Sequence, residues 1–327
     1  MSQSALPQHS SKIVRSLARI LPRTLRSLGA KFAFETNAAL GDIFGLLFAQ
    51  SYERIVASHP NPLNHCGRKV FSNADEDGIT FEIVRRIGIE CGVFAEFGVG
   101  DGLENNTIFL ASLGWKGFWV GAQKLAFSIS PSACKGCSAE FVFLREFVDR
   151  SNVVLLVRRG LEAIAEAGID VLSLDLDGND LYLIEDLLGA AILPKVFIVE
   201  YNAKFPPPIR WKIEYDPDHR WSFDDYFGAS LMEFCDLFEK HGYFLACCNS
   251  ASGANAYFVR SDYAHAFRDV PRDVNVLWAP PRYFPGKYGH PVSPKTVAQI
   301  MKNIGKVRAA RCQPLPEDQR RAQEHYS

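Results

Sequence analysis

A short apolar run followed by closely spaced glycines, at residues 93–102, constrains the fold of this chain more than any other stretch. The run reads Val-Phe-Ala-Glu-Phe and leads into Gly98, Gly100 and Gly102, after which residues 108–113 have a helical pattern. Glycines let the backbone turn sharply and approach a ligand, and the following helix has unpaired N–H groups at its N-terminus. The pattern predicts a buried strand, a tight turn and a helix beside a nucleotide-like cofactor.

The glycine spacing departs from the dinucleotide-binding fingerprint, because the third glycine comes one residue early. An acid, Glu96, stands two residues before the first glycine. This combination is typical of S-adenosylmethionine-dependent methyltransferases, in which the acid faces the amino-acid end of the cofactor. A nicotinamide-dependent oxidoreductase is a more distant alternative.

Apolar strand candidates alternate with helical patterns over most of the chain beyond residue 93. The strand candidates are residues 93–98, 118–122, 141–147, 171–176, 196–200, 244–248 and 256–260. Helical patterns between them include residues 161–167 and 181–188. The alternation predicts a parallel sheet with right-handed crossovers, and the short turn at residues 249–253 predicts a closing hairpin. We therefore expect an α/β, Rossmann-like sheet of seven strands, mostly parallel, that ends in an antiparallel hairpin as in class I methyltransferases.

Flanking segments extend this α/β domain, which we place at residues 66–265. Residues 1–65 form a basic, amphipathic, helical extension, and residues 1–34 contain no acid. Within it, residues 11–30 are open to three interpretations: a helix packed on the domain, a helix at a membrane surface, or an organelle transit peptide. Residues 266–327 are rich in proline, which predicts an irregular extension.

Composition limits the class of protein. The chain is 47% hydrophobic and 22% charged, as in ordinary globular proteins. A formal net charge of -1 gives no global attraction to nucleic acid. Eight scattered cysteines indicate no disulfide framework. We therefore expect a cytoplasmic protein with a small-molecule or glycan substrate and no nucleic-acid partner, and peripheral membrane contact if residues 11–30 bind lipid.

Acidic and amide side chains follow two neighbouring strands of the predicted sheet. Asp175 and Asp177 come at the end of the fourth strand, and Glu200 and Asn202 come at the end of the fifth. Parallel strands end at one edge of a sheet, where open α/β proteins bind ligands. Oxygen donors suit a hard cation, so Asp177, Glu200 and Asn202 are candidate Mg²⁺ ligands, with Asp177 and Asp175 as catalytic candidates. Alternatively, these groups line a polar cleft without a metal.

Several stretches together resemble the FkbM-type branch of S-adenosylmethionine-dependent methyltransferases, over about residues 71–261. They are Asp75-Glu76-Asp77-Gly78-Ile79, residues 96–107, Gly114-Trp115-x-Gly117, residues 175–180, Glu200-Tyr201-Asn202, residues 226–231, Cys248-Asn249-Ser250 and Gly253-x-Asn255-Ala256. The resemblance implies a Rossmann-like fold, S-adenosylmethionine as cofactor, and O-methylation of hydroxyls on sugars or related metabolites. Members of this group are often encoded among polysaccharide biosynthesis genes.

One departure from the class I pattern concerns the second strand, which usually ends in an acid that holds the ribose. Here Gln123 follows that strand and offers only neutral hydrogen bonds. Asp149, after the third strand, is a candidate for the adenine side or for a helix cap. His219 is a candidate general base or a surface-loop histidine. A Cys-x-x-Cys pair at residues 134–137 reads as a plain loop.

Two functions of different classes follow from these features. The first is an O-methyltransferase that acts on a hydroxyl of a glycan or related metabolite. The second is a non-catalytic binding or scaffold protein that keeps the fold, with residues 11–30 at a membrane surface. The missing ribose-binding acid favours the second, whereas Glu96 and the acidic residues of the fourth and fifth strands favour the first.

Overall fold

The computed structural model describes residues 52–128, 140–222, 225–282 and Met301, and the stretch from residue 52 to 282 belongs to one compact unit. Three predictions fall outside the described residues. They concern residues 11–30, the Cys-x-x-Cys pair at residues 134–137, and nearly all of the extension beyond residue 282.

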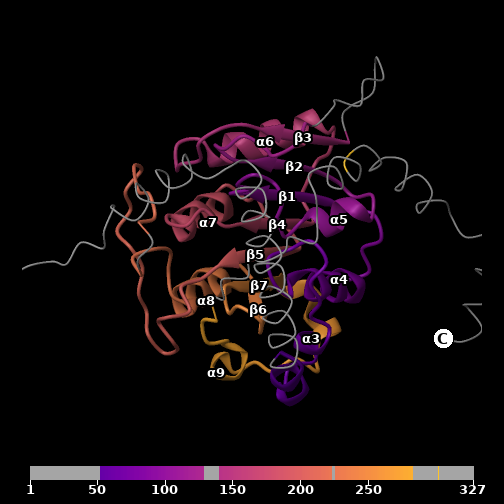
Figure 1. Ribbon diagram of the computed structural model, residues 1–327, viewed down its shortest axis with the longest axis vertical. Helices are drawn as coiled ribbons and strands as arrows, with labels where there is room; N and C mark the ends of the chain where they lie inside the picture. Colours follow the sequence, from indigo (N-terminus) through magenta and orange to yellow (C-terminus); the bar gives the residue numbers. More distant parts are fainter. Residues whose placement is uncertain (1–51, 129–139, 223–224, 283–300, 302–327) are drawn as a thin grey trace, which may run out of the picture. The chain divides into compact units, whose positions relative to one another are not determined.

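A single mixed sheet of seven strands forms the centre of this unit, in the order β3-β2-β1-β4-β5-β7-β6 (Figure 1). The strands are β1 (Val93–Phe97), β2 (Lys116–Val120), β3 (Phe141–Leu144), β4 (Val171–Leu174), β5 (Val196–Glu200), β6 (Tyr243–Cys248) and β7 (Asn255–Arg260). The first five pair in parallel, whereas β7 runs antiparallel to both β5 and β6. The predicted α/β fold class, with its seven strands and closing hairpin, is confirmed.

Helices cover both faces of the sheet, which explains why the central strands β1, β4 and β5 are buried along almost their whole length. The helices are α3 (Pro62–His65), α4 (Glu76–Arg86), α5 (Ile108–Ser112), α6 (Val153–Ala163), α7 (Asp180–Gly189), α8 (Leu231–Lys240) and α9 (Val274–Leu277), with a 3₁₀-helix at Ser261–Phe267. Helices α6, α7 and α8 lie to one side of the strands in Figure 1, and α3, α4 and α5 lie to the other. This is the layered arrangement that alternating strands and helices predict.

Helix α6 begins earlier than its sequence pattern suggested. The prediction placed a helix at residues 161–167, whereas α6 spans Val153–Ala163. A turn just before the helix accounts for this earlier start. In the turn, the Asp149 carboxylate accepts hydrogen bonds from the backbone N–H (2.8 Å) and the hydroxyl (2.5 Å) of Ser151. The Asn152 side chain in turn accepts the N–H of Asp149 at 3.0 Å. In such turns, side-chain hydrogen bonds determine where the helix begins, and the hydrophobic periodicity of the sequence does not reveal these bonds.

The acidic turn before α4 joins distant parts of the chain. Asp77 is completely buried, and its Oδ2 accepts backbone N–H groups from Val70, Phe71 and Ser72 at 2.7–2.9 Å. Asp75, buried beside it, accepts the side-chain N–H of Asn249 in the β6–β7 turn at 3.0 Å. These acids fix two loops against the N-terminus of α4.

Residues just before the predicted domain boundary also belong to the packed unit. Asn61 and Asn64 are fully buried, and their side chains donate to the backbone carbonyls of Ala246 (2.9 Å) and Cys248 (2.8 Å) in β6. Within the described residues, no helix has the length and hydrophobicity to cross a membrane. Cys91 is disulfide-bonded, which the scattered cysteines of the sequence did not lead us to expect.

Candidate functional site

The carboxyl ends of the parallel strands bring the predicted site residues to one edge of the sheet. Strand register pairs Phe97 of β1 with Val120 of β2 and with Leu174 of β4, and Leu174 with Val199 of β5. The glycine turn after β1, the acidic loop after β4 and Glu200 therefore lie at adjacent strand ends. Open α/β sheets bind ligands at this edge.

The glycine turn has a left-handed backbone that requires glycine at two positions for different reasons. Gly98 has a φ of +89°, and a Cβ atom there would lie 1.6 Å from the carbonyl oxygen of Asp175. Its N–H donates to the carbonyl of Val120 at 3.0 Å, so Gly98 holds three strand ends together. Gly100 has a φ of +52°, and a Cβ atom there would meet nothing within 4 Å. Open space beside the backbone at Gly100 is what a cofactor needs for close approach.

Glu96 fixes the start of α5. Its two carboxylate oxygens accept the backbone N–H groups of Asn106 (2.8 Å) and Thr107 (3.0 Å), and the Thr107 hydroxyl donates to it at 2.5 Å. The indole N–H of Trp119 donates to the same hydroxyl at 2.8 Å. Glu96 is buried, and burial raises its pKa to about 7. Its carboxylate thus positions the start of α5, the helix that follows the glycine turn, and we assign it a positioning role.

Two further cofactor candidates occupy different surroundings. Gln123 follows β2 and is exposed at the ligand-binding edge of the sheet. Asp149 forms a turn with Ser151 just before α6, whose N-cap residue is Asn152. Among the candidate residues for cofactor binding, Gly98 and Gln123 are exposed, Gly100 and Asp149 are partly exposed, and Glu96 and Gly102 are buried.

The acids after β4 and β5 meet as the sequence predicted. One oxygen each from Asp175, Asp177 and Glu200 lies within 4.8 Å of the other two. Strand β4 ends at Leu174, so Asp175 and Asp177 lie in the loop that follows the strand. Within this loop, Asp177 has a left-handed backbone with a φ of +54°. Burial raises the pKa of Asp175 and of Glu200, and the neighbouring carboxylates raise both further. The cluster therefore favours a bound proton or cation over full ionisation.

Asp180 supports this loop, a role that sequence reasoning missed. Its Oδ1 accepts the N–H of Leu176 at 2.7 Å, and its Oδ2 accepts the N–H of Gly178 at 2.9 Å. Asp180 is fully buried, and burial raises its pKa to about 6. An acid in the first turn of α7 was the available signal, because such residues bind preceding backbone N–H groups.

The Asn202 side chain binds the backbone of the segment that leads to α8. Its side-chain N–H groups donate to the carbonyls of Asp225 and Phe227, both at 3.0 Å, and its Oδ1 accepts the N–H of Lys204 at 3.2 Å. The three clustered acids are therefore Asp175, Asp177 and Glu200, and the Asn202 amide fixes the loop before α8.

His219 lies beside the acidic loop although it is distant in sequence. Its ring packs on Gly178, where a Cβ atom would lie 2.5 Å from the His219 Cδ2. The Asn179 side chain holds this loop by donating to the carbonyl of Asp216 at 2.7 Å. His219 also lowers the otherwise raised pKa of Asp177 electrostatically. Its Nε2 is buried and has no hydrogen-bond partner among the described residues.

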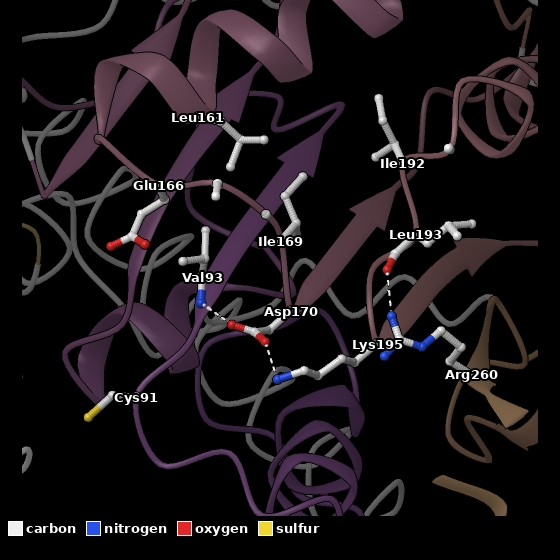
Figure 2. Close-up of a pocket in the computed structure, with 13 residues that line it drawn as sticks. Cys91, Val93, Leu161, Glu166, Ile169, Asp170, Ile192, Leu193, Lys195 and Arg260 are labelled. Carbon is white, nitrogen blue, oxygen red and sulfur yellow. Dashed lines mark hydrogen bonds and ion pairs between the residues drawn. The ribbon is translucent and has the colours of Figure 1, made fainter. Parts of the chain in front are cut away.

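A cavity of about 520 Å³ lies at the opposite, amino-terminal edge of the sheet (Figure 2). Asp170 accepts the N–H of Val93 at 2.8 Å and forms an ion pair with Lys195 at 2.7 Å. Arg260 donates to the carbonyl of Leu193 at 3.1 Å. These polar groups bind one another, and none of the predicted site residues lines the cavity. We therefore place the candidate site at the carboxyl edge.

Comparisons with known proteins show no family for this chain. No family model matches the chain, and no curated protein matches it. Among solved structures, the chain is similar to a glycopeptide N-methyltransferase, MtfA, at 14% identity and a TM-score of 0.31, over 57% of this chain and 91% of that one. A likeness this distant carries no argument about function. The α/β Rossmann-like fold rests on the strand order and pairing of the chain itself.

Proposed function

We propose that this chain is an S-adenosylmethionine-dependent methyltransferase that modifies a hydroxyl of a glycan or related metabolite. The observation that carries the proposal is the meeting of two features at one sheet edge. The glycine turn leaves open space at Gly100, and the cluster of Asp175, Asp177 and Glu200 lies at the neighbouring strand ends. A cofactor site and an acid–base site are thereby adjacent.

The residues present fit the cofactor in part. The backbone at Gly100 would approach it, Glu96 would keep the turn in shape, and Gln123 would offer neutral hydrogen bonds at the end of β2. Bound S-adenosylmethionine supplies an electrophilic methyl group. Without an acid after β2, we expect weaker binding than in methyltransferases that have one, since hydrogen bonds to charged groups are stronger.

The acidic cluster also fits a hard divalent cation. All of its donors are oxygens, and Oε2 of Glu200 is buried with no hydrogen-bond partner in the part of the chain that the structure describes. Asp175, Asp177 and Glu200 would hold Mg²⁺, which would offset their repulsion and lower the pKa of an acceptor hydroxyl beside it.

His219 is the candidate general base. Its Nε2, which has no hydrogen-bond partner within the described ranges, would accept the proton of a substrate hydroxyl, and Asp177 would stabilise the imidazolium that results. The loop contacts that fix His219 on Gly178 would orient the ring for this transfer.

A methyl-transfer assay with labelled S-adenosylmethionine and a panel of neutral glycosides tests the proposal. Asp177→Asn should lower kcat about 100-fold while changing cofactor affinity less than about threefold, because the lost interaction belongs to the transition state. Asp236→Asn, which alters an exposed acid paired with Arg210, is the matched control. EDTA should inhibit the wild type, and Mg²⁺ should restore it.

Other outcomes assign the chemistry differently. Activity that needs Asp177 yet ignores EDTA would make the carboxylate a general base without a metal. If neither the substitution nor chelation matters, the acidic cluster is not the reactive site, and His219→Gln becomes the next variant.

The second candidate function is a binding or scaffold protein with this fold. The observation that favours it is the absence of an acid after β2 combined with the use of Glu96 as an internal acceptor. Such a protein would bind glycans or a membrane surface and would show no methyl transfer.

A further inference from the structure

Four ring side chains of the segment at residues 204–228 follow one another in an unbroken row. Phe205 stacks on Trp211 with ring centroids 4.1 Å apart, and Trp211 meets Tyr226 edge-on at 5.9 Å. Tyr226 then lies 6.2 Å from the ring of His219. We call these four side chains the aromatic row. Nearly half of Tyr226, 48%, is exposed, so the row has an accessible surface.

The inner end of the aromatic row lies at the acidic cluster. His219 packs on Gly178, and the N–H of Gly228 donates to the carbonyl of Gly178 at 3.0 Å. The Tyr182 hydroxyl of α7 donates to the carbonyl of Ile213 at 2.8 Å. The segment that carries the row is therefore fixed to the loop that carries Asp177, with the rings leading outward from the acids.

The charges around the aromatic row favour a neutral ligand. Three cations of the segment form ion pairs with acids: Lys204 with Asp225, Arg210 with Asp236, and Lys212 with Glu233. The guanidinium of Arg220 lies 4.1 Å above the ring of Phe147. These cations are engaged, and the acids at the inner end repel anions, so a phosphate or sulfate would bind poorly.

Ring geometry distinguishes a flat ligand from a cationic one. Aromatic cages bind ammonium groups where several ring faces converge on one point. In the aromatic row, one pair of rings is stacked, one is edge-on and the pair of Tyr226 and His219 is tilted by 58°. The rings thus extend along a line and do not enclose a point, an arrangement that suits the apolar face of a sugar ring better than a compact cation.

We propose that the aromatic row is the acceptor platform, on which the C–H face of a neutral sugar ring packs while one hydroxyl reaches Asp177 and His219. Tyr226 supplies the accessible ring and determines specificity for the acceptor. The role of this hydroxyl as the methyl acceptor rests on the proposed function. Sugar binding itself requires neither S-adenosylmethionine nor turnover.

Calorimetric titration of the full chain with a panel of neutral methyl hexosides and methyl deoxyhexosides, without cofactor, tests the platform. We expect millimolar binding by the wild type, about tenfold weaker binding by Tyr226→Ala, and unchanged binding by Tyr226→Phe, which keeps the ring. Phe81→Ala removes an exposed aromatic side chain of α4 outside the row and should bind like the wild type. Circular dichroism of each variant checks that it is folded.

Three results would overturn the platform. They are no binding of any glycoside by the wild type, equal binding by Tyr226→Ala, or preferential binding of a phenol or an alkylammonium ion added as separate probes. Glycoside binding that depends on Tyr226 but is accompanied by no methyl transfer would support the platform and contradict the methyltransferase, so the two proposals can fail separately.

Discussion

Alanine at Gly98 and at Gly100 should have very different effects, although the two glycines share one turn. At Gly98 the new Cβ would lie 1.6 Å from the carbonyl oxygen of Asp175, and the φ of +89° is strained for any side chain. Backbone strain and overpacking each cost about 1–3 kcal/mol, so Gly98→Ala should lower the free energy of unfolding by about 4 kcal/mol. At Gly100 the Cβ meets nothing within 4 Å, and only the left-handed backbone is penalised, at about 1 kcal/mol.

Urea unfolding of both variants and the wild type, followed by circular dichroism, measures this difference. Gly100→Ala should remain folded yet bind S-adenosylmethionine more weakly by calorimetry, and the bulkier Gly100→Val should abolish binding. Two results would refute the reasoning. One is a Gly98→Ala protein as stable as Gly100→Ala, and the other is undiminished cofactor binding by Gly100→Val.

Three further predictions concern stability and the N-terminus. Burial raises the pKa of Glu76 and of Glu96 to about 7, so both acids bind protons more tightly in the folded chain than in the unfolded one. The free energy of unfolding should therefore fall by about 1 kcal/mol or more from about pH 5 to about pH 8. The fall should be less steep in Glu96→Gln. Urea titrations that show a rise in the free energy of unfolding over this range would contradict the prediction. Asp180→Ala leaves two backbone N–H groups without their acceptor and should lower the free energy of unfolding by about 2 kcal/mol. The control Asp218→Ala, at an exposed position, should change the free energy of unfolding by less than about 0.5 kcal/mol. The full chain should sediment with anionic liposomes and be released by salt, and a chain lacking residues 1–34 should not sediment; identical behaviour of the two would rule out a membrane-surface helix.

Regular patterns made the sheet and the acidic cluster predictable. Alternating strands and helices determine a parallel sheet, and a short turn between the last two strands determines its closing hairpin. Because parallel strands end at one edge, the sequence alone predicts that Asp177 and Glu200 lie together, as they do in the structure. Residues at the ends of regular elements are therefore accessible to sequence reasoning.

Loop contacts were not predictable in the same way. The use of Glu96 as an acceptor depends on how residues 106 and 107 enter α5, and the contact of His219 with Gly178 depends on a long irregular segment. Asn202 had the chemistry of a metal ligand, but nearby backbone carbonyls bind its side chain instead. Periodicity carries no information on such contacts, because they are set by side-chain hydrogen bonds between segments distant in sequence.

Calorimetric titration of the full chain with S-adenosylmethionine, and separately with NAD, tests the central claim most directly. The account predicts saturable binding of S-adenosylmethionine, loss of that binding in Gly100→Val, and no binding of NAD, since the glycine turn lacks the dinucleotide spacing. Binding of NAD in preference to S-adenosylmethionine, or no binding of S-adenosylmethionine by a folded wild-type protein, would contradict it.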